Sequence, residues 1–194
     1  MSLLIVVSSP SGGGKTTACE GLLKRDPRVR RSITCTTRAP RESEVNGRDY
    51  YFLSPEEFSK REQRGEFLET ATVHGHRYGS LKGTIAAMLE SGHDVLLAID
   101  VQGAESVRGV AKLDKTLARA HVDVFLMPPS FDVLEQRLRK RATDAAEVIA
   151  RRLADAREEI KQAPRYQHVV TSGTIEQDIV NLKKIVEAER KKRM

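Results

Sequence analysis

Short apolar stretches alternate with amphipathic stretches along much of the chain. Strand-like runs rich in Val, Ile and Leu cover residues 3–8, 94–99, 121–126 and 168–171. Stretches with helical periodicity cover residues 15–25, 102–112, 131–140, 147–162 and 175–192. Because strands that alternate with helices form parallel sheets, the pattern predicts an α/β fold with helices on both faces of the sheet. We expect any ligand at the carboxyl ends of the strands.

Two regions interrupt this alternation. Residues 32–90 contain short strand-like pieces at 32–36, 49–53 and 67–73, which we interpret as a small α+β insertion. A short helix is predicted after Ser54, because Ser54 suits the cap position and is followed by Pro55 and Glu57 at favourable positions. The arginine-rich residues 137–152 form a second irregular piece and a candidate lid.

The segment SSPSGGGKTT at residues 8–17 has the composition of a phosphate-binding loop between a strand and a helix. It fits the pattern G-x-x-x-x-G-K-[ST] except at Ser9, which stands where the first glycine is expected. Glycines let backbone N–H groups turn toward phosphate oxygens, and the helix N-terminus adds a positive dipole end. We predict that Lys15 reaches the β- and γ-phosphates and that Thr16 offers its hydroxyl to Mg²⁺. The residues expected to bind the triphosphate are Ser11, Gly12, Gly13, Gly14, Lys15, Thr16 and Thr17.

The P-loop alone leaves motors, GTPases, kinases and nucleotidases open. The chain has 194 residues, of which 39% are hydrophobic and 31% charged, and this suits one α/β domain with insertions. Its net charge of +6 is spread over short basic clusters, which favours an enzyme with two phosphorylated ligands over a nucleic-acid binder. No apolar run approaches the length needed to cross a membrane, so no membrane partner is expected. With no recognisable export signal and no C-x-x-C motif, Cys19 and Cys35 are expected as reduced thiols in the cytoplasm.

The insertion carries a second set of polar residues. Its motifs are TCTTRAPR at 34–41, EVNGRDY at 44–50, FLE at 67–69 and YGS at 78–80. Arg38 and Arg41 can grip one phosphate group with their guanidinium forks, and Tyr50 and Tyr78 can add hydroxyl donors. Glu69 is a lone acid in an otherwise apolar strand. The alternative is that the arginines are surface charges, that Glu69 faces solvent from its strand, and that the tyrosines belong to the core.

Together with IDVQG at 99–103, these ordered motifs make nearly the whole chain resemble the guanylate kinase family. The resemblance implies that ATP phosphorylates GMP, and also dGMP, with Mg²⁺, in purine nucleotide metabolism. It implies that the GMP phosphate is held by Arg38, Arg41, Tyr50 and Tyr78. It further implies that Glu69 accepts hydrogen bonds from guanine, that Ser80 and Thr34 face the O6 side, and that Asp100 serves guanine recognition or the Mg²⁺ water shell.

The same resemblance divides the chain into a P-loop core (1–33 and 81–194), a GMP-binding insertion (34–80) and a lid at about 137–152. It implies that lid arginines close over the phosphates of ATP. The expected catalytic set is Lys15, Arg41, Arg137, Arg141 and Arg152.

Some residues depart from the family pattern. Ala98 stands where an acidic residue is usual, and Thr34 stands where serine is usual. A catalytically weak guanylate-kinase-like binding module and a kinase for another small phosphorylated substrate therefore stay open as alternatives. His74 and His76 could suggest a metal pair, but the sequence offers no evident third ligand.

Overall fold

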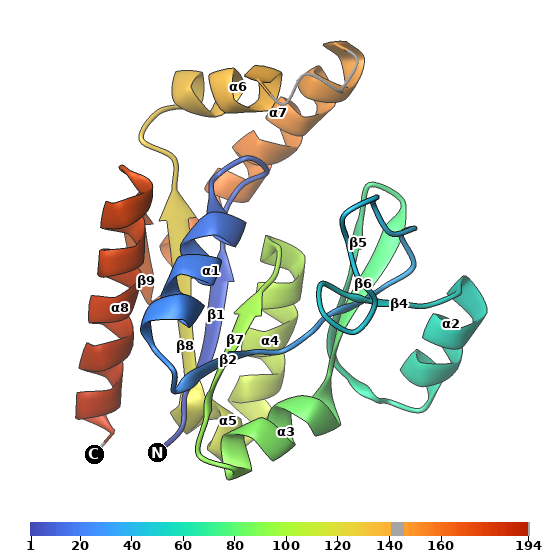
Figure 1. The fold of residues 1–194 in the computed structure, drawn as a ribbon, viewed down its shortest axis with the longest axis vertical. Coiled ribbons are helices and arrows are strands. Elements are labelled where there is room, and N and C mark those ends of the chain that lie inside the picture. Colours follow the sequence, from blue (N-terminus) through green and yellow to red (C-terminus); the bar gives the residue numbers. More distant parts are fainter. Residues whose placement is uncertain (141–145, 194) are drawn as a thin grey trace.

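The computed structural model describes residues 1–140 and 146–193, and its larger sheet is wholly parallel. The strand order is β2-β7-β1-β8-β9 (Figure 1). The strands are β1 Leu4–Ser8, β2 Val29–Arg31, β7 Asp94–Ala98, β8 His121–Met127 and β9 His168–Thr171. The predicted α/β fold with a parallel sheet is confirmed. The short edge strand β2 was not expected, because its Val-Arg-Arg sequence is too short and too polar to be recognised.

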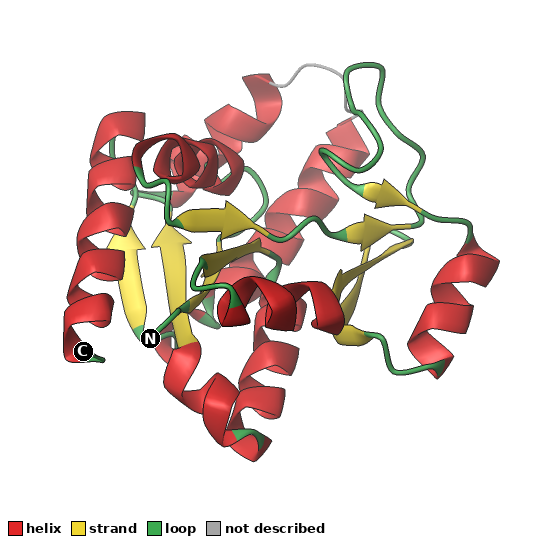
Figure 2. Ribbon diagram, turned by 60° about the horizontal axis from the view of Figure 1, so that its bottom comes forward, coloured by secondary structure: helices red, strands yellow, loops and turns green. Residues whose placement is uncertain are grey.

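Both faces of this sheet are buried, so its central strands are mainly apolar. Their polar residues are also buried, and these are Ser8, Asp94, His121 and Asp123. On one face, Ile5 and Val7 of β1 pack in a core with α1 Lys15–Arg25 and α8 Ile175–Lys192. On the other face, Leu4 and Val6 pack in a second core with three further helices. Those helices are α3 Lys82–Glu90, α4 Val101–Leu113 and α5 Lys115–Ala120. Figure 2 shows helices on both sides of the larger sheet. The two helical layers hold the carboxyl ends of the strands in fixed positions.

A second, mixed sheet lies beside the core and has the strand order β4-β3-β6-β5 (Figure 1). Its strands are β3 Cys35–Thr36, β4 Tyr51–Phe52, β5 Phe67–Val73 and β6 His76–Leu81. Helix α2, Pro55–Gln63, covers it by stacking Phe58 on Phe67, with 4.6 Å between ring centroids. The predicted helix start is confirmed, since the Ser54 hydroxyl accepts the Glu57 N–H at 3.1 Å.

The sequence interpretation missed β6 and the helices α3 and α5. Strand β6 begins at His76 and pairs antiparallel with β5. The polar sequence of β6 contains a glycine, so its strand conformation depends on hydrogen bonds to β3 and β5 rather than on local preference. The turn between β5 and β6 is tight, and His74 has a φ of 49°.

The expected irregular piece at 137–152 is helical wherever the structure describes it. It comprises the end of α6, Phe131–Lys140, and the start of α7, Ala146–Ile160. Leu134, Leu138 and Ala156 form a small apolar cluster of their own between these helices. Figure 1 shows α6 and α7 next to the loop that joins β1 to α1. The short 3-10 helix η1, Ala163–Arg165, then leads to β9.

Among the helices in residues 1–140 and 146–193, none combines the length and the apolar character needed to cross a membrane.

Candidate active site

The loop between β1 and α1 presents an uncapped helix N-terminus. Gly12 and Gly14 have φ values of 81° and 92°, in the left-handed region that favours glycine. Gly14 is the N-cap of α1, and within the described chain no side chain makes a capping hydrogen bond there. The first N–H groups of α1 therefore point toward a position where an anion can accept them.

Ser9 takes the place of the first motif glycine without backbone strain. In the described part of the chain, His74 is the only non-glycine residue with a positive φ, so Ser9 does not need the left-handed conformation. Its side chain is buried, and its hydroxyl donates to the Pro10 carbonyl at 3.0 Å. The loop thus accommodates serine at this position.

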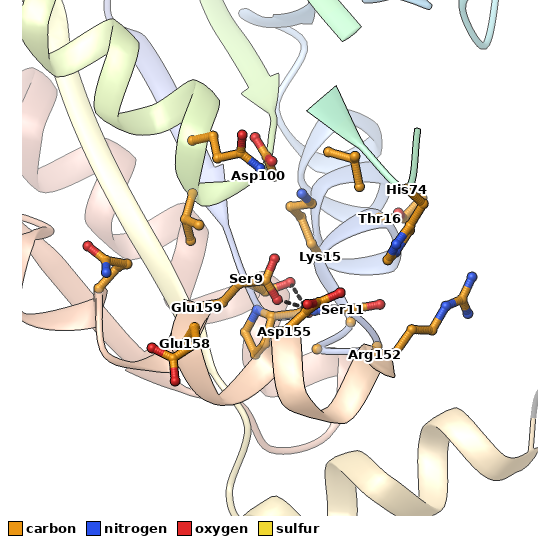
Figure 3. Close-up of a pocket in the computed structure, with 18 of the residues that line it drawn as sticks. Ser9, Ser11, Lys15, Thr16, His74, Asp100, Arg152, Asp155, Glu158 and Glu159 are labelled. Carbon is orange, nitrogen blue, oxygen red and sulfur yellow. Dashed lines mark hydrogen bonds between the residues drawn. The ribbon is translucent and has the colours of Figure 1, made fainter. Parts of the chain in front are cut away.

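The P-loop lines a cavity of about 1390 Å³ at the carboxyl ends of β1 and β7 (Figure 3). Residues of α7, among them Arg152 and Asp155, form the facing wall. Asp100, just after β7, lines another side, and Arg41 and His74 connect the cavity to the smaller sheet. The cavity is large enough for a nucleotide and lies where the topology predicts a ligand.

Lys15 points from the first turn of α1 toward the end of β7. Its ammonium group donates to the backbone carbonyl of Ile99, with 2.7 Å between Nζ and O. Burial lowers the pKa of Lys15, and the nearby carboxylates of Asp100, Glu159 and Glu69 oppose this effect. The Lys15 side chain thus joins the P-loop to the end of β7.

Glu159 is a site residue that the sequence interpretation missed. Its Oε2 accepts the backbone N–H of Ser11 at 3.0 Å, so a carboxylate of α7 is bound to the P-loop (Figure 3). Burial raises the pKa of Glu159, while the Ser11 hydrogen bond and Lys15 act in the opposite direction. An acid on an amphipathic helix carries no sequence signal for a partner 148 residues away.

The lid arginines occupy different positions. A Cβ added to Gly14 would lie 3.9 Å from Nη1 of Arg137, so Arg137 reaches the P-loop. Arg152 lines the cavity from α7. Arg141 lies outside the described residues. Arg157, for which no function was expected, stacks over the Phe131 ring at 4.6 Å and joins α7 to α6.

Glu69 lies buried in β5, opposite Ser80 of β6. The Ser80 hydroxyl, also buried, donates to Glu69 Oε1 at 2.7 Å. Burial raises the pKa of Glu69 to about 7; the Ser80 hydrogen bond opposes this shift and the Asp100 carboxylate adds to it. Thr34, just before β3, is also buried. The second sheet thus holds a carboxylate whose protonation changes near neutral pH.

The predicted phosphate-binding residues form a separate cluster. The rings of Tyr50 and Tyr78 meet edge to face, with 6.1 Å between centroids, and the Arg38 guanidinium lies 5.5 Å from the Tyr50 centroid. Glu44, for which no role was expected, pairs with Arg38 at 2.8 Å and accepts the Arg41 N–H at 2.8 Å. The side chain of Arg41 is exposed at the cavity, so the structure groups Arg38 with both tyrosines and leaves Arg41 nearer the P-loop.

Asp100 caps α4, because its Oδ1 accepts the Gly103 N–H at 2.9 Å. Ala98, the last residue of β7, adds no carboxylate beside it. Within residues 1–140 and 146–193, no three His, Cys, Asp or Glu side chains converge into a group that could hold a metal ion, and this includes His74 and His76.

Known guanylate kinases are similar to this chain in sequence and in fold. The family described as "Guanylate kinase" matches residues 1–189. A guanylate kinase of Paramagnetospirillum magneticum is 43% identical over 191 residues, which cover 98% of this chain and 86% of that protein. A guanylate kinase of Cereibacter sphaeroides is 44% identical, with 98% and 88% covered. The crystal structure of guanylate kinase from Anaplasma phagocytophilum has a TM-score of 0.77 and 32% identity, with 97% and 86% covered. The chain therefore belongs to the guanylate kinase family.

Proposed function

We propose that this kinase transfers the γ-phosphoryl group of ATP to GMP, and also to dGMP, and that Glu69 selects the guanine base. The main support is the buried carboxylate of Glu69, oriented by the Ser80 hydroxyl, in a chain with an open P-loop. Guanine presents two adjacent donors, N1–H and the exocyclic amine, beside the acceptor O6. The Glu69 carboxylate complements the two donors, the Ser80 hydroxyl donates to that carboxylate, and the Thr34 hydroxyl would donate to O6. Adenine would leave the buried carboxylate without donors, which discriminates strongly.

We assign the acceptor half of the site to residues 34–80 and the donor half to the core, residues 1–33 and 81–194. Arg38, Tyr50 and Tyr78 form one cluster and would hold the GMP phosphate together with Arg41. This arrangement would direct the phosphate of GMP toward the P-loop cavity, which the Arg41 side chain already lines.

The reaction would need little covalent chemistry from the protein. A phosphate oxygen of GMP attacks the γ-phosphorus, and it is largely ionised near neutral pH because its second pKa is about 6. Alignment of the two substrates and neutralisation of charge supply the catalysis. Lys15, Arg41, Arg137 and Arg152 are the cations that we assign to this task. The lid at about 137–152 would exclude water and so limit hydrolysis of ATP.

The residues present are compatible with Mg²⁺, which kinases bind through one or two protein oxygens and the phosphates of the substrate. Thr16 lies exposed in the first turn of α1, and Asp100 lines the same cavity. The Thr16 hydroxyl would hold the ion, with Asp100 in its water shell. When bound, the ion would neutralise charge that develops on the β- and γ-phosphates.

The proposal is tested by ADP production with GMP, dGMP, AMP, CMP, UMP and dTMP as acceptors, each with and without Mg²⁺. We expect turnover with GMP and dGMP, and only when Mg²⁺ is present. The absence of ADP production with GMP would refute GMP as the substrate. Equal rates with GMP and AMP would refute the role of Glu69.

A binding module without catalysis is not favoured, because the chain retains the phosphate-binding loop from Gly12 to Thr16. We also propose that the protein works in the cytoplasm, where the thiols of Cys19 and Cys35, which are free and buried, would stay reduced.

A further inference from the structure

Helix α4 contains two glycines, Gly103 and Gly109, although glycine weakens a helix relative to alanine. Neither has a positive φ, so neither is required by its backbone conformation. Their surroundings differ. A Cβ added to Gly109 would meet nothing within 4 Å. A Cβ added to Gly103 would lie 2.6 Å from Oε2 of Glu69, well inside van der Waals contact.

The Glu69 carboxylate is thus confined on two sides. Its Oε1 accepts the Ser80 hydroxyl at 2.7 Å, while its Oε2 lies against the bare Cα of Gly103. The residue is only 4% exposed, so a displaced carboxylate would have to give up its present contacts. Helix α4 is also joined to β5, because the Gln102 side-chain amide donates to the Thr72 carbonyl at 3.2 Å. A group added at position 103 would therefore meet the carboxylate rather than open the interface.

We propose that Gly103 is a positioning residue that leaves the Glu69 carboxylate room to receive guanine. This inference rests on the proposed function, in which Glu69 recognises the base. A methyl group at position 103 would push Oε2 away from α4 and turn the carboxylate from its bond with Ser80. The displaced atom is the tip of a side chain, so the fold can absorb the change while the geometry of base recognition cannot.

We expect Gly103→Ala to affect the use of the acceptor GMP more than the use of ATP. The tightest contact of the added methyl group is with Glu69 Oε2 at 2.6 Å, while Ile99 and Asp100 lie farther away, at 3.2 and 3.3 Å. Displacement of a recognition group by about 1 Å can weaken a reaction about 100-fold. We therefore expect Gly103→Ala to raise the KM for GMP about tenfold to 100-fold, with the KM for ATP within about twofold of wild type.

The ratio of the kcat/KM values for GMP and inosine monophosphate is a readout that a general loss of structure would not change. Inosine monophosphate shares N1–H and O6 with GMP but lacks the exocyclic amine. In wild type, the carboxylate should favour GMP over this analogue because it can accept from two donors. In Gly103→Ala, the ratio of the two kcat/KM values should fall toward one.

The experiment compares Gly103→Ala with Gly109→Ala. The second variant makes the same change in the same helix, at a position where the added Cβ meets nothing within 4 Å. Glu69→Gln tests the proposed function separately. Support requires a raised KM for GMP and a reduced GMP preference in Gly103→Ala, with wild-type values and an unchanged or higher Tm in Gly109→Ala. If Glu69→Gln raises the KM for GMP but Gly103→Ala does not, the role of Gly103 is refuted and the proposed function stands. If Glu69→Gln has no effect on GMP, the role assigned to Glu69 fails, and this inference fails with it.

A second variant keeps the test decisive if Gly103→Ala proves less stable. In the double variant Gly103→Ala with Glu69→Asp, the shorter acid withdraws from the methyl group. Glu69→Asp should then impair GMP use less in the Gly103→Ala background than in wild type, which is a measurable coupling. Additive effects, or equal rises in the KM for GMP and for ATP, would overturn the inference.

Discussion

The ammonium group of Lys15 donates to the backbone carbonyl of Ile99, with 2.7 Å between Nζ and O. The P-loop lysine thus reaches across to the end of β7, next to Asp100, rather than lying along its own loop (Figure 3). This position is in the cavity that the P-loop and Asp100 line together. A cation there can serve both the donor and the acceptor phosphates.

Lys15→Ala should reduce kcat by about 10²- to 10³-fold, because it removes a preorganised charge that stabilises the transferring phosphoryl group. Steady-state kinetics with saturating ATP and GMP measure this directly. Lys24→Ala is the matched control, since Lys24 is an exposed lysine on the same helix. Turnover of Lys15→Ala near the wild-type value would contradict the role given to the P-loop.

The raised pKa of Glu69, about 7, predicts that GMP use depends on pH. Guanine needs the ionised carboxylate as acceptor, so the KM for GMP should rise as pH falls through 7. A single group of that pKa gives a rise of about fourfold between pH 8 and pH 6.5. This range stays above the second phosphate pKa of GMP, about 6. The KM for ATP should not follow the same curve, and Glu69→Gln should flatten it. A pH-independent KM for GMP in wild type would count against this role.

The raised pKa of Glu69 also affects the stability of the folded protein. Because the pKa of Glu69 is higher in the folded protein than its ordinary value of 4.5, the folded state holds this proton more tightly than the unfolded chain. The contribution of Glu69 to stability therefore falls as pH rises from about 4.5 to about 7. Glu69→Gln should remove this part of the pH dependence of the free energy of unfolding, as measured by denaturant titration. An unaltered pH dependence in the variant would exclude Glu69 as its source.

The bond between Glu159 and Ser11 should hold the P-loop against α7. Glu159→Ala removes the acceptor and should raise the KM for ATP by about two- to tenfold, which corresponds to a hydrogen bond of about 0.5–1.5 kcal/mol. Glu159→Gln keeps an oxygen acceptor and should retain an ATP KM close to that of wild type. Initial-rate kinetics with varied ATP distinguish the two. Equal losses in both variants would indicate that the charge, not the hydrogen bond, is what matters.

Arg190 near the end of α8 should be important for stability rather than for catalysis. Its guanidinium donates to Asp94 at 2.6 Å and to Asp26 at 2.8 Å, and both carboxylates are buried. Arg190→Met would leave two buried acids without this partner and should lower the free energy of unfolding by about 3–5 kcal/mol. Chemical denaturation measures the change, with Lys191→Met at the exposed neighbouring position as control. A loss below about 1 kcal/mol would show that other groups satisfy these acids.

The local elements could be predicted where short-range periodicity is strong. Helix α1, helix α6 and strand β9 have the predicted bounds, because their pattern of apolar residues is unambiguous. Strand β6 could not be predicted, since its polar residues with a central glycine adopt an extended form only when paired on both sides. The strand order of the core, β2-β7-β1-β8-β9, also depends on packing between segments distant in the chain.

The sequence by itself determined the chemistry: a P-loop lysine, paired arginines, and an isolated acid in an apolar strand are recognisable because each motif lies within a few residues. The tertiary structure decided which groups meet. It joined Glu159 to Ser11, placed Lys15 on Ile99, and set the bare Cα of Gly103 against Glu69. These contacts connect different helices, strands and loops of the fold. They arise from the close packing of helices on the two sheets, which no local pattern along the chain encodes.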